Sequence, residues 1–390
     1  MEHDIVIIGG GILGLTVANE ILERDKKVRL AIFEKEEHLA KHQTGRNSGV
    51  IHSGIYYDPE SIKSEYCIKG GARLKKYCKQ NQMPLKKIGK MVIASNQDEL
   101  ENLYFLKKRA EILNLKHRIV GTVECRDIEP LAHCVEALHL PEVCITDYSA
   151  IAQSLKDRAQ LLGADFFFSC RVEKVECDID HSYIYTKNKK YISKNVINCA
   201  GVYADSFLRS LHKRKIRIIP FKGVYWKTTG LKVGSNLYPV PNLKFPFLGV
   251  HFTPTVNGEV LIGPNAFLSL HKEGYGNFDF DFKDSLDIFS FPGFWNFSRK
   301  NFNTCLKELK NSSRNSIWKS AKLICPSLPL ESIRYHSSGI RAQALTKEGK
   351  LCDDFVFVND GNMLNVVNAP SPAATSSFEI AKHIVDKIDL

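Results

Sequence analysis

The stretch HDIVIIGGGILGLTVANEILERDKKVRLAIFEK, residues 3–35, decides the fold class. Its apolar, β-branched start is typical of a strand that is buried in a parallel sheet. Gly9, Gly11 and Gly14 form a GxGxxG motif at the end of that strand. The first glycine permits a tight turn, the second leaves room for a pyrophosphate, and the third lets the next helix pack closely. We therefore predict a strand–turn–helix unit whose helix N-terminus faces a phosphate.

A second predicted strand contains Val28, Leu30 and Ile32 and ends at Glu34. The carboxylate of Glu34 can accept hydrogen bonds from an adenosine ribose, and it repels a 2′-phosphate. A glycine motif alone is weak evidence. Its combination with the strand, the amphipathic helix and an acidic residue about 20 positions later indicates a dinucleotide-binding unit. The motif does not distinguish NAD from FAD.

Two distant segments extend this α/β pattern. KNVINCAGVYADSF (194–207) predicts a strand that ends in an Ala-Gly turn. VVNAPSPAATSSFEIAKHIV (366–385) predicts a strand, a loop stiffened by two prolines, and a closing helix. The N-terminus of that helix can stabilise negative charge on a reduced flavin. An ordinary capped helix at the end of the chain is the alternative.

The composition is that of a globular enzyme. Hydrophobic residues make up 44% of the chain and charged residues 25%, which excludes a disordered chain. The length of 390 residues is too great for one compact core and indicates two domains. The net charge of +11 favours an anionic partner, such as a carboxylate substrate or a phosphate-bearing cofactor. The densest basic run, HKRKIRI at 212–218, is interpreted as a solvated loop before a strand. We expect no nucleic-acid partner.

Cysteine usage and the start of the chain predict a cytoplasmic protein. Eleven cysteines without a CxxC pair or zinc-type spacing indicate reduced thiols and no metal site. The first strand begins at Asp4, which predicts that there is no signal peptide, and no apolar run reaches membrane-spanning length. Residues 278–302 are rich in Phe and Trp with basic residues between them. They predict a small helical core or a surface that docks on a membrane or a second subunit.

Seven further segments carry a resemblance to a known family. They are HQTGRNSGVIHSGIYY (42–57), NCAGVYAD (198–205), IIPFKGVYW (218–226), YPVPNLKFPFLGVHFTP (238–254), GPNAFLS (263–269), SGIRAQAL (338–345) and NAPSPAATSS (368–377). In this order along nearly the whole chain, they resemble the D-amino-acid-oxidase-type FAD family. The resemblance implies an FAD cofactor and a second, sheet-containing domain over the flavin ring.

The expected fold is α/β, with a Rossmann-like FAD-binding domain and a mixed-sheet substrate-binding domain. We expect the FAD-binding domain to be discontinuous, comprising residues 1–80, 150–215 and 335–390, and the substrate-binding domain to comprise 81–149 and 216–334. Within the second domain, DELENLYFLKKRAEIL (98–113) predicts an amphipathic helix.

The resemblance implies a set of cofactor contacts at matching positions. The polar loop QTGRNS offers donors, and the backbone of the strand residue Val172 is expected to meet adenine. The full set is Gly9, Gly11, Ile12, Leu13, Gly14, Glu34, Lys35, Gln43, Thr44, Arg46, Asn47, Ser48, Val172, Ala200, Gly201, Asn368, Ala369, Pro370, Ser371, Pro372 and Ala373.

A flavin enzyme that acts on a 2-hydroxy acid needs an anchor for the carboxylate and an acceptor for the hydroxyl proton. Arg341 is the predicted anchor, because a guanidinium holds a carboxylate with two parallel hydrogen bonds. His52 and His251 are both candidates for the proton acceptor. His52 has two alternatives, covalent attachment to the flavin and simple packing. A dicarboxylic substrate needs a second contact, for which Lys222 and Tyr225 are the candidates.

The resemblance implies oxidation of L-2-hydroxyglutarate to 2-oxoglutarate, with a hydride passing from C2 to flavin N5. The electrons would go on to a membrane quinone, another acceptor or oxygen. An amine oxidase of the glycine or sarcosine oxidase type is one alternative, and a non-catalytic flavin-binding scaffold is another. Attachment to the inner face of a membrane and the oligomeric state stay open.

Overall fold

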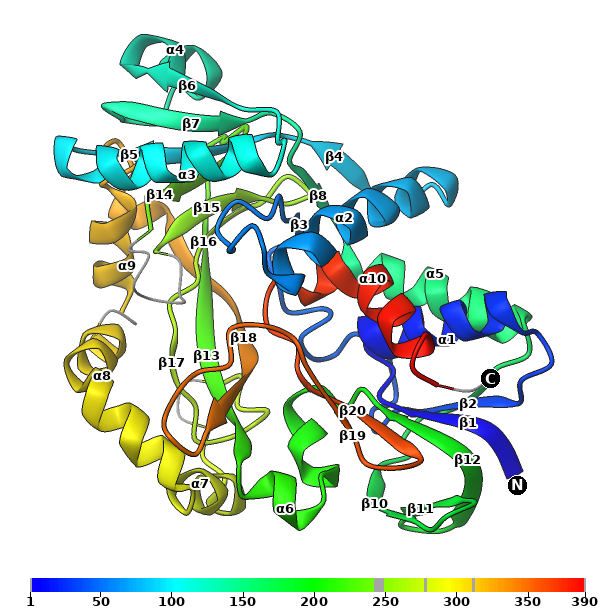
Figure 1. Cartoon of the computed structure of the whole chain (residues 1–390). Helices are drawn as coiled ribbons and strands as arrows, with labels where there is room; N and C mark the ends of the chain where they lie inside the picture. Colours follow the sequence, from blue (N-terminus) through cyan, green and yellow to red (C-terminus); the bar gives the residue numbers. More distant parts are fainter. Residues whose placement is uncertain (1, 242–248, 277–278, 311–312, 389–390) are drawn as a thin grey trace.

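Two large sheets, joined by a small one, organise the chain (Figure 1). The computed structural model describes residues 2–241, 249–276, 279–310 and 313–388. Helices gather on one side of the first sheet and also pack against the second. The predicted α/β class is confirmed, while the predicted domain boundaries stay a prediction.

Among the described residues, the first sheet has eight strands and a parallel centre. They are β1 (Glu2–Ile8), β2 (Leu30–Phe33), β9 (Asp165–Phe167), β10 (Val172–Cys177), β11 (Ser182–Thr186), β12 (Lys190–Asn198), β19 (Val356–Asn359) and β20 (Met363–Asn368). β1 pairs in parallel with both β2 and β12, and the end of β12 pairs in parallel with β20. The carboxyl ends of β1, β12 and β20 therefore share one edge, where open α/β sheets bind ligands.

Four helices lie together on one side of this sheet (Figure 1). They are α1 (Ile12–Arg24), α2 (Ile62–Gln80), α5 (Tyr148–Leu161) and α10 (Ala373–Val385). Glycines allow close contact between these elements. A Cβ on Gly14 would lie 2.0 Å from the Gly9 carbonyl oxygen, and one on Gly70 would lie 2.8 Å from the Cα of Ser376. α1 therefore packs tightly against the glycine turn, and α2 against α10.

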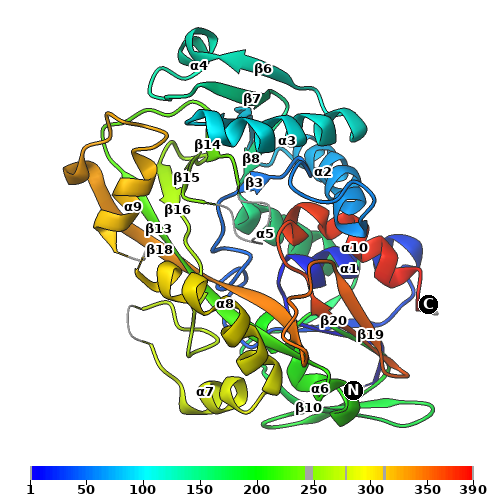
Figure 2. The same ribbon diagram turned by 60° about the vertical axis from the view of Figure 1, so that its left-hand side comes forward.

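Within the described residues, the second sheet is mixed and has nine strands. They are β5 (Lys90–Ala94), β6 (Arg118–Gly121), β7 (Glu136–Leu140), β13 (Ile216–Thr228), β14 (Asn236–Pro239), β15 (His251–Pro254), β16 (Val260–Gly263), β17 (Phe267–Leu268) and β18 (Ile333–Thr346). β14 and β5 pair in parallel. β13 and β18 pair antiparallel from end to end and cross the molecule side by side (Figure 2).

Short elements complete the architecture. The small sheet has the strands β3 (Val50–Ile51), β4 (Leu85–Lys87) and β8 (Cys144–Thr146), and the other helices are α3 (Leu100–Ile112), α4 (Thr122–Ile128), α6 (Ser210–Lys213), α7 (Phe282–Phe289), α8 (Pro292–Lys310) and α9 (Arg314–Ala321). α3 confirms the predicted amphipathic helix, because Leu103, Leu106 and Ala110 are buried. No helix in the described part of the chain combines the length and apolarity that crossing a bilayer requires.

The aromatic stretch at 278–302 forms α7 and the start of α8, except that Phe278 lies outside the described residues. Phe291 and Phe294 are buried and pack with residues of β13 and β18, which agrees with the predicted helical core. Phe282, Trp295 and Phe302 are instead 74%, 49% and 60% exposed. The stretch is therefore partly core and partly an aromatic surface.

Candidate active site

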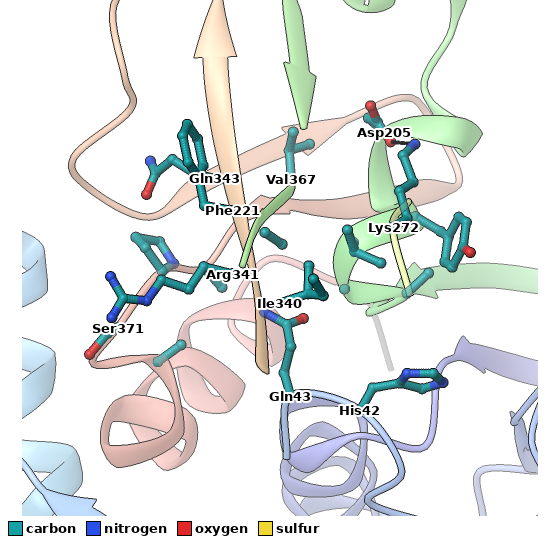
Figure 3. A pocket seen from close by; sticks show the side chains of 18 of the residues that line it. His42, Gln43, Asp205, Phe221, Lys272, Ile340, Arg341, Gln343, Val367 and Ser371 are labelled. Atoms are coloured by element: carbon teal, nitrogen blue, oxygen red, sulfur yellow. Dashed lines mark ion pairs between the residues drawn. The ribbon is translucent and has the colours of Figure 1, made fainter. Parts of the chain in front are cut away.

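A cavity of about 3000 Å³ lies between the edge of the first sheet and the face of the second. That is larger than the roughly 300–1,000 Å³ of an ordinary small-molecule pocket, so a dinucleotide and a substrate fit together. Figure 3 shows the side chains of Gln43, Arg341 and Ser371 converging on it from three segments, with Arg341 pointing toward Ser371.

The glycine turn has the geometry that the sequence predicts. Gly9 has φ +105°, and a Cβ there would lie 2.4 Å from the carbonyl oxygen of Cys199 on the neighbouring strand. Gly11 is the N-cap of α1 and provides no side-chain cap. The hydroxyl of Thr44 accepts a hydrogen bond from the Ile12 N–H at 3.0 Å. The start of α1 thus opens onto the cavity with a partial positive charge.

Glu34 follows β2 and lines the cavity beside this turn. Its two carboxylate oxygens accept the N–H groups of Gly10 and Glu36, each at 2.9 Å. The carboxylate is therefore fixed in place by backbone donors, in the position that a ribose requires in Rossmann-type folds.

Most of the predicted cofactor positions line the cavity. The lining positions are Gly9, Gly11, Ile12, Leu13, Glu34, Lys35, Gln43, Thr44, Arg46, Asn47, Ser48, Val172, Ala200, Gly201, Ala369, Pro370, Ser371, Pro372 and Ala373. Gly14 lies behind the turn, where it serves packing. The glycine turn, the uncapped helix start, the fixed carboxylate and the roomy cavity together fit a flavin dinucleotide.

Two polar side chains of the QTGRNS loop use their donors within the protein. The Asn47 amide donates to the carbonyls of Gln43 and Thr44 at 3.0 and 2.7 Å. The Arg46 guanidinium donates to the carbonyls of Lys41 and Ser338 and stacks on the Tyr275 ring, 3.8 Å from its centroid. These two residues shape the loop, and the neighbouring Gln43 side chain points into the cavity (Figure 3).

Besides Gly14, two predicted site residues do not lie on the cavity wall. Asn368 is fully buried, and its amide bonds the Ala344 N–H and the carbonyls of Cys352 and Asp354 at 2.7–2.9 Å. It therefore ties the 370–373 loop to β18. The Lys222 ammonium donates to the Gly276 carbonyl and is buried behind β13. Side chains alternate along a strand, which explains why Lys222 is excluded while Tyr225 reaches the cavity.

The four other residues predicted for the chemistry meet on the same wall. His52, Tyr225, His251 and Arg341 all line the cavity. The His52 Nε2 lies 3.4 Å from the Ser371 hydroxyl, and Arg341 interacts electrostatically with both Tyr225 and His251. One guanidinium, two imidazoles and a phenol therefore converge from β13, β15, β18 and the loop after β3.

Both histidines are neutral at cellular pH. Burial lowers the pKa of His52 to about 3 and that of His251 to about 3, and the charge of Lys90 acts in the same direction. His251 is 5% exposed, and its Nδ1 donates to the Gly249 carbonyl at 2.8 Å. Its Nε2 is then the unprotonated nitrogen. A neutral imidazole with a free lone pair is suited to accept a proton.

Sequence reasoning missed an aromatic and basic cluster beside these histidines. Tyr238 stacks on His251 with ring centroids 3.9 Å apart, and Tyr56, Tyr57 and Tyr238 line the cavity. Lys90 lies behind Tyr56 and Tyr238. The tyrosine pair in GIYY was a visible signal for part of this cluster. No local sequence signal pointed to Lys90, because its position beside Tyr238 depends on the pairing of β5 with β14, about 150 residues away.

Glu36, His42 and Glu273 bring possible metal-ligand atoms within 4.8 Å of one another. The Lys35 ammonium forms ion pairs with both glutamates, and the His42 Nδ1 bonds the Tyr275 hydroxyl at 2.7 Å. Lys41 also pairs with Glu36 at 2.7 Å, so two ammonium groups of the protein balance the two carboxylates. The cluster connects the loop after β2 to the 273–275 loop.

The turn, the helix start and the shared sheet edge define a dinucleotide-binding protein of the Rossmann type. The chain belongs to the FAD dependent oxidoreductase family, whose model matches residues 4–387. It is thus an oxidoreductase with FAD as its cofactor, as predicted.

Similar proteins cover nearly the whole chain. It is 38% identical to an L-2-hydroxyglutarate dehydrogenase of Indibacter alkaliphilus, over 97% of both chains. It is also 38% identical to the human mitochondrial L-2-hydroxyglutarate dehydrogenase, over 99% of this chain and 89% of the human one. An FAD-bound L-α-glycerophosphate oxidase from Mycoplasma pneumoniae has the same fold, with a TM-score of 0.80 and 23% identity over 99% of this chain and 94% of the other.

Proposed function

We propose that the protein oxidises L-2-hydroxyglutarate to 2-oxoglutarate. The observation that carries the proposal is the meeting of Arg341 with two neutral histidines on the wall of a cavity that begins at a dinucleotide-binding turn. An anchored 2-hydroxy acid needs this combination of a cation and a proton acceptor. Extensive similarity to proteins named L-2-hydroxyglutarate dehydrogenase supports the choice of substrate.

Arg341 binds the C1 carboxylate in this proposal. Its guanidinium is planar and permanently charged, so two parallel hydrogen bonds fix the orientation of the substrate. The long pairing of β18 with β13 holds Arg341 in register opposite Phe221. The anchor is therefore rigid, which favours a reactive alignment of C2.

His251 accepts the hydroxyl proton at Nε2. Its other nitrogen is engaged with the Gly249 carbonyl, which fixes the tautomer, and stacking on Tyr238 fixes the ring plane. Burial alone leaves the imidazole a weak base. The arriving dicarboxylate adds negative charge beside it, which favours the imidazolium and raises the pKa of His251. His52, next to Ser371, supports the substrate from the loop after β3.

The cofactor positions on the cavity wall would hold FAD. The start of α1 would bind the pyrophosphate, Glu34 the ribose and the Val172 segment the adenine, and the 369–373 loop would lie on the side of the flavin ring. When bound, FAD accepts the hydride equivalent that the substrate loses. The protein residues keep the substrate oriented and exclude water from the site.

Anaerobic reduction of the bound flavin tests the function. L-2-hydroxyglutarate is expected to bleach the yellow absorbance, whereas the D-enantiomer leaves it unchanged. Bleaching by sarcosine or glycine instead would assign the protein to amine oxidation. A spectrum that no 2-hydroxy acid changes would identify a non-catalytic scaffold.

We further propose that a quinone at a membrane surface takes up the electrons, in a cytoplasmic protein that binds the membrane peripherally. The support is the exposed aromatic surface of α7 and α8, of which Trp295 and Phe302 also line the cavity beside the basic Arg299. Aromatic and basic side chains together suit an anionic lipid surface. The described cysteines are free thiols, which agrees with a reducing compartment. Sedimentation with anionic vesicles is expected to pellet the protein, and its absence from the pellet would contradict the proposal.

A further inference from the structure

Lys90, the first residue of β5, is a buried amine without an anionic partner in the described part of the chain. Its side chain is 2% exposed. Among the described residues, no carboxylate lies within 4 Å of its Nζ, and the group donates no hydrogen bond to any of them. Burial lowers the pKa of Lys90 well below its usual value. An isolated buried charge is costly, so such a lysine calls for a compensating partner.

The surroundings of Lys90 lead to the cavity. Its Nζ lies 3.6 Å from the ring centroid of Tyr238 and 4.1 Å from that of Tyr56. Both rings line the cavity, and their π faces attract the ammonium group. Lys90 itself does not line the cavity, so it acts on a ligand from behind the two rings.

Tyr56 adds a second unsatisfied group at the same place. Its hydroxyl oxygen is buried and has no hydrogen-bond partner in the described part of the chain. Buried tyrosine hydroxyls normally have a partner. An acceptor that arrives with a ligand would supply one.

Three other basic residues are already engaged. Arg109 donates to the Tyr56 carbonyl at 2.8 Å, which fixes the Tyr56 segment, and Lys63 donates to the Asp353 carbonyl at 2.9 Å. Lys222 donates to the Gly276 carbonyl away from the cavity. Unlike these three side chains, the Lys90 ammonium donates no hydrogen bond to an oxygen atom of the described residues.

We propose that Tyr56 and Lys90 form the subsite for the second carboxylate of a dicarboxylic 2-hydroxy acid. The Tyr56 hydroxyl donates a hydrogen bond to that carboxylate, and the Lys90 ammonium balances its charge through the Tyr56 and Tyr238 rings. Arg341 and Lys90 both interact electrostatically with His251, which places the two cations around the proton acceptor. The inference rests on the proposed function, and it identifies what selects a dicarboxylate over a monocarboxylate.

Substrate selectivity of the flavin-containing protein tests the subsite. The rate of anaerobic flavin reduction is measured with L-2-hydroxyglutarate and with L-2-hydroxypentanoate, which has the same chain length but a methyl group in place of the distal carboxylate. In Lys90→Met and Tyr56→Phe, we expect the preference for the dicarboxylate, expressed as the ratio of kcat/KM values, to fall by about thirtyfold or more. The kcat/KM value for the monocarboxylate should change little.

Matched variants separate this role from a structural one. Tyr104→Phe, at an exposed tyrosine that bonds Glu136, should keep the wild-type ratio, and so should Lys222→Met. A lower ratio in Lys222→Met, with a wild-type ratio in Lys90→Met, would move the subsite to β13 and overturn the proposal. Equal losses with both substrates would also overturn it. Tyr56→Phe keeps the ring over Lys90, so it remains informative if Lys90→Met does not fold.

The wild-type protein separates failure of this subsite from failure of the proposed function. A flavin that L-2-hydroxyglutarate does not reduce in the wild type would contradict the function itself. Normal wild-type reduction, with unchanged ratios in Lys90→Met and Tyr56→Phe, would contradict only the subsite.

Discussion

The dinucleotide-binding edge and the substrate wall face each other across one cavity but are built in opposite ways. The edge begins with a contiguous unit, β1, the glycine turn, α1 and β2, in which neighbours in sequence are neighbours in space. The wall combines side chains from β13, β14, β15 and β18 with a lysine of β5 that lies behind the ring of Tyr238. The dinucleotide-binding edge thus forms largely through local geometry, whereas the proposed substrate wall forms through long-range strand pairing.

The two regions also differ in how they use charge. At the edge, backbone N–H groups satisfy the Glu34 carboxylate, and the N-terminus of α1 is open to a phosphate. At the wall, buried histidines are kept neutral and a buried lysine has no anionic partner in the described residues. The edge is therefore complete in itself, while the wall is arranged for a negatively charged ligand.

The largest effect is expected at the edge, from Gly14→Ala. The added Cβ would lie 2.0 Å from the Gly9 carbonyl oxygen, which forces α1 away from the turn. We expect a destabilisation of about 3 kcal/mol and loss of most of the bound flavin. Chemical denaturation measures the loss of stability, and the flavin-to-protein absorbance ratio measures the loss of bound flavin. Gly121→Ala, where nothing lies within 4 Å of the new Cβ, is the control. A Gly14→Ala protein with a full flavin complement would contradict this account of the edge.

The next largest effect is expected at the wall, from Arg341→Met. Loss of the carboxylate anchor should slow flavin reduction by L-2-hydroxyglutarate about a thousandfold while FAD stays bound. The rate of flavin reduction in Arg341→Lys should lie between those of the wild type and Arg341→Met. An ammonium keeps the positive charge but does not form the paired hydrogen bonds. Stopped-flow absorbance measures the rates. Arg334→Met, on the exposed part of the same strand, should behave as wild type. Loss of FAD in Arg341→Met would show that the two regions are not separable.

A comparison of His251→Gln with His52→Gln sharpens the assignment within the wall. We expect flavin reduction by L-2-hydroxyglutarate to slow about a hundredfold in His251→Gln, because the proton acceptor is removed. In His52→Gln the rate of flavin reduction should fall less. The rates are compared at saturating substrate between pH 6 and pH 9. The reverse order would make His52 the base and His251 the supporting residue.

The smallest effect concerns stability. Burial lowers the folded-state pKa of His251 to about 3, whereas the unfolded chain binds that proton near pH 6.5. The unfolded state therefore binds more protons between pH 6.5 and pH 3, and stability falls as the pH is lowered through this window. From pH 7.5 to pH 5, His251 should account for about 2 kcal/mol of lost stability. Urea denaturation of the wild type and of His251→Asn at both pH values measures it, and an equal loss in the two proteins would refute the assignment.

The same contrast explains what the sequence predicts and what it does not. The glycine spacing, the β-branched run and Glu34 lie within one local unit, so the turn, α1 and the place of the Glu34 carboxylate beside the turn were predictable. Arg341, His52 and His251 were identified through family resemblance, and the structure places them on one cavity wall. The burial of Lys222 was also not predictable, because the alternation of side chains along β13 turns it toward the Gly276 carbonyl and away from the cavity. Lys90 gave no local signal, since only the pairing of β5 with β14 brings it behind Tyr238.

The path of the chain governs how the molecule comes apart. It leaves the first sheet after β2, enters the second at β5, returns at β9, departs for β13 and comes back at β19. Pulling the sheets apart would therefore strain several connections together, including the Asn368 amide that joins the 370–373 loop to β18. Heating should melt both sheets in a single calorimetric transition, and a protease cut in one surface loop should leave the fragments associated.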